Sequence, residues 1–231
     1  LYSICEIMVK IVGHRGVRFI EPENTLRAIR RAIELGVDAV EIDIRATSDM
    51  NIVVIHDETL DRTTNGRGYV NKYTLSELRS LDAGKGEKIP TLNEVINEID
   101  GKVELFIEIK DPIIVRKVVE IVSRYDYSWM HVISFYHPIV KIVKNLLPKI
   151  STGIIVSSEP VDPIYLTRSA NADIIIPNIR YASDRLIKIC HENNILVSGW
   201  VINDPKIFKQ YSDKLDYITT DRPDIIIPLV R

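Results

Sequence analysis

The sequence has 231 residues, of which 45% are hydrophobic and 27% charged, and its formal net charge is −2. This composition is that of a soluble globular protein, and the balanced charge argues against nucleic acid as the main partner. No apolar run reaches the roughly 20 residues that cross a bilayer, so we expect no integral membrane association. Two cysteines, Cys5 and Cys190, are too few for a disulfide framework and favour a reducing, cytoplasmic location.

The start of the chain carries none of the features of a secretory signal peptide, because it lacks a basic region followed by a long apolar region. Since the first residue is Leu1, we expect Met8 to be the functional start. Residues 1–8 are then an N-terminal extension, and a single domain is expected over residues 9–231.

The first predicted elements are a strand and a helix. Residues 9–13 form a short apolar run that ends at a glycine, which predicts a buried strand. Apolar residues then recur with helical spacing from Leu26, after Asn24 or Thr25 as the N-cap. Gly36 is the predicted end of this helix.

The second strand is predicted over residues 37–44. Glu41 and Asp43 lie two residues apart in it, so both side chains point to the same face. The segment that follows is too short for a helical crossover. Residues 44–56 are therefore predicted to form an antiparallel hairpin that brings His56 close to Asp43.

Residues 57–88 are rich in glycine and polar residues and are predicted to be a small insertion after the second strand. From Leu92 the pattern becomes a helix followed by a strand, repeated six times. The predicted helices cover residues 92–99, 113–124, 137–147, 162–170, 183–193 and 204–210, and the strands cover 103–109, 131–135, 151–156, 173–176, 195–201 and 216–219. Without the hairpin, the chain has eight strands that alternate with helices, which is typical of a closed parallel barrel and also of an open doubly wound sheet.

Polar side chains decide between these two folds. They fall at or just past the carboxyl ends of the predicted strands, and the set, with one tryptophan, is His14, Glu41, Asp43, Glu108, Lys110, Ser134, Trp200, Thr220 and Asp221. A barrel collects all such ends on one rim, whereas an open sheet gathers them only near its switch point. We therefore predict an α/β fold, a TIM (β/α)8 barrel with a small insertion after the second strand.

Three of these residues, Glu41, Asp43 and Glu108, are carboxylates that offer only oxygen ligands. No Cys or His is grouped with them, so a hard cation, Mg²⁺ or Ca²⁺, fits better than Zn²⁺. Their neighbours in sequence are apolar, and buried unpaired carboxylates are costly. Either a cation or the nearby Arg15 and Lys110 must offset their charge, and the spacing favours a metal site over plain salt bridges.

His14 and His56 are the candidates for proton transfer, because histidine titrates near neutral pH and serves as either acid or base. Arg15 offers a planar fork for phosphate oxygens and Lys110 a point charge, and both also neutralise acids. Trp200 is a candidate for the pocket wall, with core packing as the equal alternative. The other histidines lack this context and are interpreted as structural: His131, His137 and His191.

A series of short motifs follows one another along residues 9–224. They are Gly13-His14-Arg15-Gly16, Pro22-Glu23-Asn24-Thr25, Glu41-Ile42-Asp43, His56-Asp57, Leu60-Asp61-Arg62-Thr63-Thr64-Asn65-Gly66, Ile89-Pro90-Thr91-Leu92, Glu108-Ile109-Lys110, Trp200 with Asn203, and Thr220-Asp221-Arg222-Pro223. Each motif alone is weak, but the ordered set is highly specific. In this set the chain closely resembles the glycerophosphodiester phosphodiesterases.

The resemblance implies a TIM barrel that hydrolyses glycerophosphodiesters to sn-glycerol 3-phosphate and an alcohol, within lipid and glycerol metabolism. It implies one divalent cation, and it assigns the residues by role: metal ligands Glu41, Asp43 and Glu108, acid and base His14 and His56, phosphate contacts Arg15 and Lys110, and the glycerol contact Trp200. Two departures are small. Val201-Ile202 replaces a common Thr-Val pair, and Phe106 stands where many members have Asn.

Two competing interpretations stay open. A related barrel phosphodiesterase, sphingomyelinase D-like or phosphatidylinositol phospholipase C-like, acts on intact phospholipid, but the sequence shows no exposed apolar loop or basic amphipathic helix for membrane docking. A catalytically inactive phosphate-binding protein is disfavoured because the polar site positions are all present. The sequence does not choose the alcohol headgroup, Mg²⁺ or Ca²⁺, the histidine that acts as acid, the first nucleophile, or monomer against homodimer.

Overall fold

The computed structural model describes residues 8–230, so most of the predicted N-terminal extension, residues 1–7 with Cys5, lies outside the described residues. Within residues 8–230, eight parallel strands form one sheet. They are β1 (Lys10–Gly13), β2 (Ala39–Ala46), β4 (Glu104–Ile109), β5 (Met130–Ser134), β6 (Ser151–Val156), β7 (Ile174–Pro177), β8 (Leu196–Trp200) and β9 (Tyr217–Thr220). Strand β1 pairs with both β2 and β9, which closes the sheet. The predicted TIM barrel is confirmed, and the open sheet is not formed.

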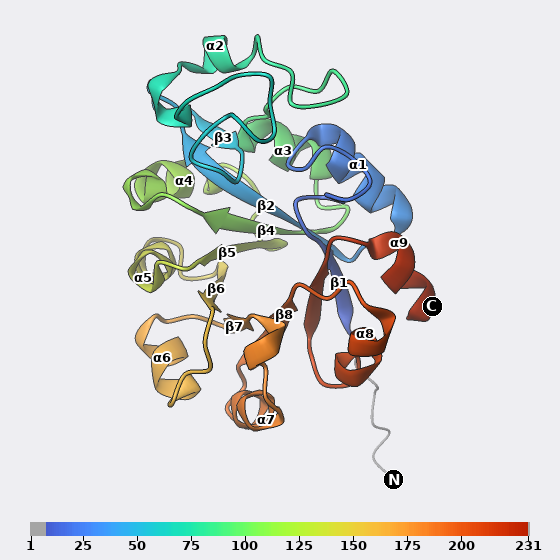
Figure 1. The fold of residues 1–231 in the computed structure, drawn as a ribbon. Helices are drawn as coiled ribbons and strands as arrows, with labels where there is room; N and C mark the ends of the chain where they lie inside the picture. Colours follow the sequence, from blue (N-terminus) through green and yellow to red (C-terminus); the bar gives the residue numbers. More distant parts are fainter. Residues whose placement is uncertain (1–7, 231) are drawn as a thin grey trace.

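Helices surround this ring of strands (Figure 1). They are α1 (Leu26–Leu35), α3 (Leu92–Ile99), α4 (Val115–Val122), α5 (His137–Leu146), α6 (Pro163–Ser169), α7 (Asp184–Glu192), α8 (Pro205–Tyr211) and α9 (Pro223–Ile226). All but α9 agree with the predicted helices to within a few residues. Helix α9 is not predicted, because its four residues are too few to show helical periodicity. Single 3-10 turns lie at Val70–Lys72, Pro112–Ile114, Ile179–Tyr181 and Ile227–Leu229.

The ends of α1 show how local chemistry sets these boundaries. The Thr25 side chain accepts a hydrogen bond from the Ala28 amide, so Thr25 is the N-cap. At the other end Gly36 adopts a left-handed conformation with φ 85°, which favours glycine. The buried face of the helix, which includes Ile29 and Ala32, packs against the barrel.

The apolar core has two parts, one between the strands and the helices and one inside the barrel. The interior part consists of Val12, Ala39, Phe106, Ile133, Ile155, Ile174, Ile176 and Tyr217. Phe106 stacks on His131 with ring centroids 4.2 Å apart and contacts Tyr217 edge-on. This departure from the common family pattern therefore belongs to the packed interior.

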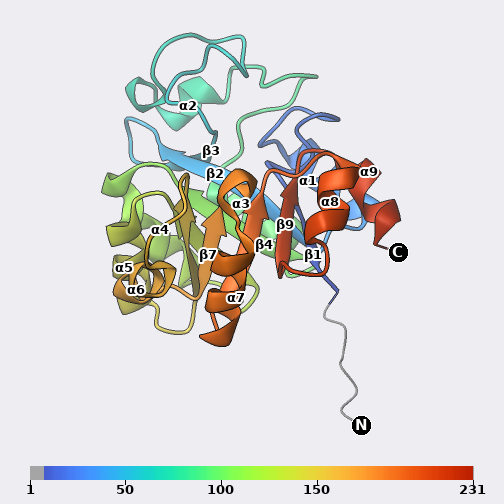
Figure 2. The ribbon, with the colours of Figure 1, turned by 60° about the horizontal axis from the view of Figure 1, so that its bottom comes forward.

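Strand β2 continues beyond its barrel partners and pairs in antiparallel fashion with β3 (Ile52–Val54), which confirms the predicted hairpin. The insertion, residues 57–88, follows β3 and contains one short helix, α2 (Leu75–Leu78). Figures 1 and 2 both show α2 and its flanking loops apart from the ring of helices. The insertion packs around a small apolar cluster of its own with the hairpin: Val53, Ile55, Leu60, Val70, Leu78, Ala83 and Ile89.

Three histidines have local partners in the structure. A ring nitrogen of His131 lies 2.9 Å from Glu104, and one of His191 lies 2.9 Å from Asp216. His137 contacts the carbonyl oxygen of Ile155 at 3.0 Å. These contacts agree with the structural interpretation of all three.

Among the described residues 8–230, no helix is long and apolar enough to span a membrane. Cys190 is a buried free thiol, and burial raises its pKa to about 11.

Candidate active site

A cavity of about 370 Å³ opens at the carboxyl ends of the barrel strands. The residues predicted for the site that line it are His14, Arg15, Glu41, His56, Glu108, Lys110 and Trp200. Asp43 is fully buried and lies within ion-pair distance of Arg15 and Lys110. The structure thus brings every predicted site residue to one place.

The three carboxylates form one buried cluster. Glu41 and Asp43 come from β2, and the parallel register of the sheet places Glu108 of β4 directly beside Asp43. One oxygen of each residue lies within 4.8 Å of the others. All three side chains face the barrel interior because they occupy alternate positions on neighbouring strands.

Two cationic side chains contact this cluster. Lys110 Nζ lies 3.0 Å from Asp43 Oδ1 and 2.6 Å from Glu108 Oε1. Arg15 Nε lies 3.1 Å from Asp43 Oδ2, and the Arg15 amide donates a hydrogen bond to Glu41 Oε2 at 3.0 Å.

Some carboxylate oxygens of the cluster are left without hydrogen bonds. Glu41 Oε1 has no hydrogen-bond partner. Lys110 approaches Asp43 Oδ1 and Glu108 Oε1 at ion-pair distances but not along a hydrogen-bond direction, so these two oxygens are also unsatisfied as acceptors. Buried acceptors without partners are costly, and they are oxygen ligands of the kind that hard cations prefer. The residues present therefore fit a divalent cation.

The pKa values of the cluster reflect its crowding. Burial and the neighbouring Asp43 raise the pKa of Glu108 to about 7. Burial and the same neighbour raise the pKa of Glu41 well above its ordinary value. Burial also opposes ionisation of Asp43, but Lys110 and Arg15 hold its pKa below the usual range. A bound cation would favour the ionised form of all three acids.

The turn after β1 places His14 and Arg15. Gly16 has φ 81°, and a Cβ atom there would lie 2.7 Å from the backbone of Ala28 in α1. Only glycine allows this close packing of the turn on the helix.

His14 is held by Asp221 at the end of β9. Its Nδ1 lies 2.6 Å from Asp221 Oδ1, and its Nε2 lies 3.9 Å from Glu41 Oε2. Asn203 Nδ2 donates a hydrogen bond to the other Asp221 oxygen at 2.8 Å. Burial lowers the pKa of His14, although the hydrogen bond to Asp221 opposes this effect. The ring is thus fixed through Nδ1, and Nε2 stays available.

His56, after the hairpin, has a similar arrangement. Its Nδ1 lies 2.6 Å from Asp57 Oδ1. Burial lowers the pKa of His56 in spite of the nearby Asp43 charge. Its side chain is 32% exposed, whereas that of His14 is 11% exposed, so the two histidines sit at different depths.

Four residues have contacts that sequence reasoning did not assign: Glu23, Asn24, Asp57 and Asp221. Asn24 exchanges two hydrogen bonds with Asp43, donating from Nδ2 at 2.9 Å and accepting the Asp43 amide at 3.2 Å. Glu23 Oε1 accepts a hydrogen bond from Arg15 Nη1 at 2.7 Å. Their positions in the sequence could have indicated a role, because all four lie inside the motifs quoted above or directly beside a predicted site residue.

The opposite side of the cavity is apolar. Trp200 Nε1 donates a hydrogen bond to the Ile176 carbonyl at 3.1 Å, and the Phe135 ring meets the indole edge-on with centroids 5.8 Å apart. Val201, which belongs to the Val201-Ile202 departure from the common pattern, also lines this side. The cavity therefore has a charged half on β1, β2, β4 and the hairpin, and an apolar half on β5 to β8.

Comparison with known proteins gives one consistent result. The model of the glycerophosphoryl diester phosphodiesterase family matches residues 14–225. A glycerophosphodiester phosphodiesterase of Caldanaerobacter subterraneus subsp. tengcongensis is 35% identical, over 96% of this chain and 97% of that protein.

Two solved structures are similar over nearly their whole length. A phosphodiesterase of Oleispira antarctica, in complex with the product sn-glycerol-3-phosphate, has a TM-score of 0.90 and 28% identity over 96% of this chain and 97% of that one. A glycerophosphodiester phosphodiesterase of Agrobacterium tumefaciens has a TM-score of 0.85 and 29% identity over 96% of this chain and 100% of that one. Fold, site and relatives agree, and the chain therefore belongs to the glycerophosphoryl diester phosphodiesterase family.

Proposed function

We propose that this enzyme hydrolyses glycerophosphodiesters to sn-glycerol 3-phosphate and an alcohol in the cavity at the carboxyl ends of the strands. The observation that carries the proposal is a buried cluster of three carboxylates at one cavity, together with two cationic side chains, Arg15 and Lys110, and two histidines. The product bound to the Oleispira antarctica enzyme supports this substrate class. The proposal includes a single domain over residues 9–231, a cytoplasmic location, a role in lipid and glycerol metabolism, and a monomer or homodimer.

Glu41, Asp43 and Glu108 are the residues that would hold one divalent cation, Mg²⁺ or Ca²⁺. Their donor atoms are all oxygens, and Glu41 Oε1 lacks a partner in the protein. A cation bound there would supply positive charge that stabilises the negative charge of the phosphate oxygens in the transition state.

Arg15 and Lys110 would bind the remaining phosphate charge, because both line the cavity beside the carboxylates. Arg15 donates a hydrogen bond from Nη1 to Glu23 and lies in an ion pair with Asp43 through Nε, and both contacts restrict its guanidinium before substrate arrives. Trp200 on the apolar side would contact the carbon atoms of the glycerol group.

His14 and His56 would transfer the protons. Each has one ring nitrogen engaged by an aspartate, which leaves the other nitrogen for the substrate. One histidine takes a proton from the nucleophile, and the other delivers a proton to the leaving alcohol oxygen. The nucleophile is either water or the glycerol 2-hydroxyl, which forms a cyclic phosphate that water then opens.

A second candidate function has support from one observation. Three large side chains are exposed after strands of the barrel: Ile113 after β4 and Val161 after β6 are 71% and 91% exposed, and Tyr165 in the first turn of α6 is 73% exposed. Val161 and Tyr165 follow β6, whose Ile155 contributes to the apolar half of the cavity. An intact phospholipid or lysophospholipid would place its hydrocarbon on this side.

Metal dependence tests the main proposal directly. Metal-stripped protein is expected to release sn-glycerol 3-phosphate from glycerophosphocholine only after Mg²⁺ or Ca²⁺ is added. Without a divalent cation, the negative carboxylates would repel the phosphate of the substrate. The release is measured with a coupled glycerol 3-phosphate assay, with EDTA as the control. Equal release in EDTA contradicts the metal site, and no release with any divalent cation contradicts the proposed reaction.

The pH dependence of cation binding tests the same cluster. A carboxylate must lose its proton to bind a cation, and Glu108 has a pKa raised to about 7. We expect the affinity for Mg²⁺ or Ca²⁺ to rise by about tenfold or more between pH 6 and pH 8, since the loss of a single proton gives about one factor of ten per pH unit below the pKa. Isothermal titration calorimetry measures this change, and an affinity that is constant across the range contradicts it.

Substitution of the histidines tests the proton-transfer roles. His14→Ala and His56→Ala are each expected to lower turnover by roughly 10²- to 10⁴-fold, the usual contribution of a general acid or base. Circular dichroism checks that the fold persists. His191→Gln, in a pair with Asp216 outside the cavity lining, is the matched control and should keep full activity. Rates like those of the unmodified enzyme in either alanine variant refute the assignment.

Vesicle binding separates the two candidate functions. If glycerophosphodiesters are the substrates, the protein stays in the supernatant when phosphatidylcholine vesicles are sedimented, and lysophosphatidylcholine is not cleaved. Sedimentation together with lysophosphatidylcholine cleavage, both reduced in a Val161→Ser/Tyr165→Ser variant, establishes the second function instead. Ile142→Ser on α5, exposed to 40% but not part of a loop at the cavity, is the control.

A further inference from the structure

Arg62 in the insertion binds two carboxylates at once. Its Nε and Nη2 donate to the two oxygens of Asp57 at 2.7 and 2.9 Å. Its Nη1 and Nη2 donate to the two oxygens of Glu23, both at 2.8 Å. All three guanidinium nitrogens are therefore engaged, and the planar group meets each carboxylate with two bonds, which is the strongest and most directional form of this contact.

Each of these carboxylates also holds a residue of the proposed active site. Asp57 Oδ1 lies 2.6 Å from His56 Nδ1, and Glu23 Oε1 accepts a hydrogen bond from Arg15 Nη1 at 2.7 Å. A continuous chain of contacts thus runs from His56 through Asp57, Arg62 and Glu23 to Arg15. Arg62 is therefore connected to His56, one of the two residues proposed for proton transfer, and to Arg15, one of the two residues proposed for phosphate binding.

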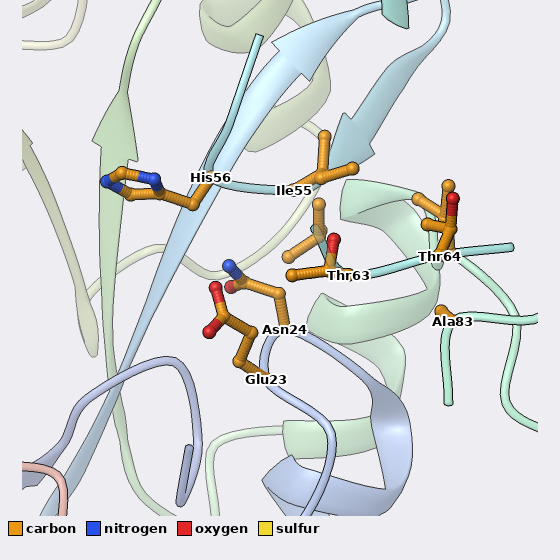
Figure 3. Close-up of a pocket in the computed structure, with 9 residues that line it drawn as sticks. Glu23, Asn24, Ile55, His56, Thr63, Thr64 and Ala83 are labelled. Atoms are coloured by element: carbon orange, nitrogen blue, oxygen red, sulfur yellow. The ribbon is translucent and has the colours of Figure 1, made fainter. Parts of the chain in front are cut away.

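The backbone around Arg62 is well fixed. Leu60, two residues earlier, is fully buried in the small core of the insertion. The carbonyl of Leu60 accepts hydrogen bonds from both the amide and the hydroxyl of Thr64. Figure 3 shows Thr63 of the insertion next to Asn24, in a small pocket that Glu23 and His56 also line, so the insertion meets the barrel beside these residues.

Besides Arg62 and Arg15, the one cationic side chain near Glu23 among residues 8–230 is Arg18, and it makes no hydrogen bond to Glu23. Arg18 Nε lies 3.9 Å from Glu23 Oε2 and 3.6 Å from Asp221, which is beyond hydrogen-bond distance for both. Burial opposes the ionisation of Glu23, and Arg62 together with Arg15 holds its pKa below the ordinary value. Loss of Arg62 leaves Glu23 with Arg15 as its one close partner among the described residues.

We propose that Arg62 is a positioning residue of this enzyme: it sets the His56 ring through Asp57 and the Arg15 guanidinium through Glu23. The insertion is then a working part of the active site, although Arg62 does not line the cavity. This inference rests on the proposed function of the same site. Its alternative is that Arg62 only docks the insertion on the barrel.

We call the Arg62 network the clamp, with one arm through Asp57 to His56 and the other through Glu23 to Arg15. Steady-state kinetics on glycerophosphocholine, with the activating cation present, separate the effects of these two arms. Asp57→Asn is expected to lower kcat, because it frees the His56 ring. Glu23→Gln is expected to raise KM, because it frees Arg15. Arg62→Gln is expected to do both, each by roughly 10- to 100-fold, the loss that follows when a reacting group is misplaced by about 1 Å.

A double variant tests whether Arg62 acts through Glu23. Arg62→Gln/Glu23→Gln should raise KM no further than Arg62→Gln alone, because residues in one chain of contacts are not additive. Affinity for sn-glycerol 3-phosphate, measured by calorimetry, should fall in Arg62→Gln and Glu23→Gln but not in Asp57→Asn. This measurement follows the Arg15 arm without relying on turnover.

Two further variants exclude a purely structural role. Arg62→Lys keeps the charge without the planar fork, so it should recover thermal stability while kcat and KM stay impaired. Arg67→Gln changes an exposed arginine of the same insertion whose side chain makes no hydrogen bond or ion pair within residues 8–230, and this variant should match the unmodified enzyme.

The outcomes are distinguishable. If Arg62→Gln lowers the melting temperature but keeps kcat and KM within twofold per folded molecule, Arg62 only docks the insertion and the proposal is wrong. If the unmodified enzyme fails to cleave glycerophosphodiesters, the proposed function is wrong, and unchanged binding of sn-glycerol 3-phosphate by Arg62→Gln then rejects the clamp as well.

Discussion

The structure depends on one electrostatic constraint, the burial of three carboxylates at the centre of a barrel rim. Glu41, Asp43 and Glu108 face one another because parallel strands in register place alternate side chains on the same interior face. Their mutual repulsion and desolvation are opposed by Lys110 and Arg15. A cluster of this kind persists only where the surrounding fold is rigid. The closed barrel is rigid because apolar side chains pack both inside it and between its strands and helices.

The neighbouring elements then serve to hold the few charged groups that face this cluster. The turn packed on α1 aims Arg15, the hairpin delivers His56, and the final strand places Asp221 against His14. His14, Arg15 and His56 each have an acidic partner that does not line the cavity, namely Asp221, Glu23 and Asp57. Such partners reduce the reorganisation that the site requires when substrate binds.

Much of this arrangement is predictable from the sequence, for a physical reason. The strand period of two residues places Glu41 beside Asp43, and the short link to Ile52 leaves only an antiparallel hairpin for the delivery of His56. Contacts between segments that are far apart in the sequence leave no periodic pattern of residues from which they could be predicted. The pairing of Arg62 with Glu23, and the exposure of Val161, depend on how loops pack, and single-sequence patterns carry no register for loops.

The closure of the barrel between its first and last strands also has a consequence for the life of the chain. His14 and Asp221 stand 207 residues apart, and they meet only because β1 pairs with β9. During synthesis the amino-terminal half leaves the ribosome with His14 but without the strand that brings Asp221 to it. We therefore expect the chain to become active only after the last strand has been made and has paired with β1. A chain that ends before this strand lacks the partner of His14, however much of the barrel has already formed.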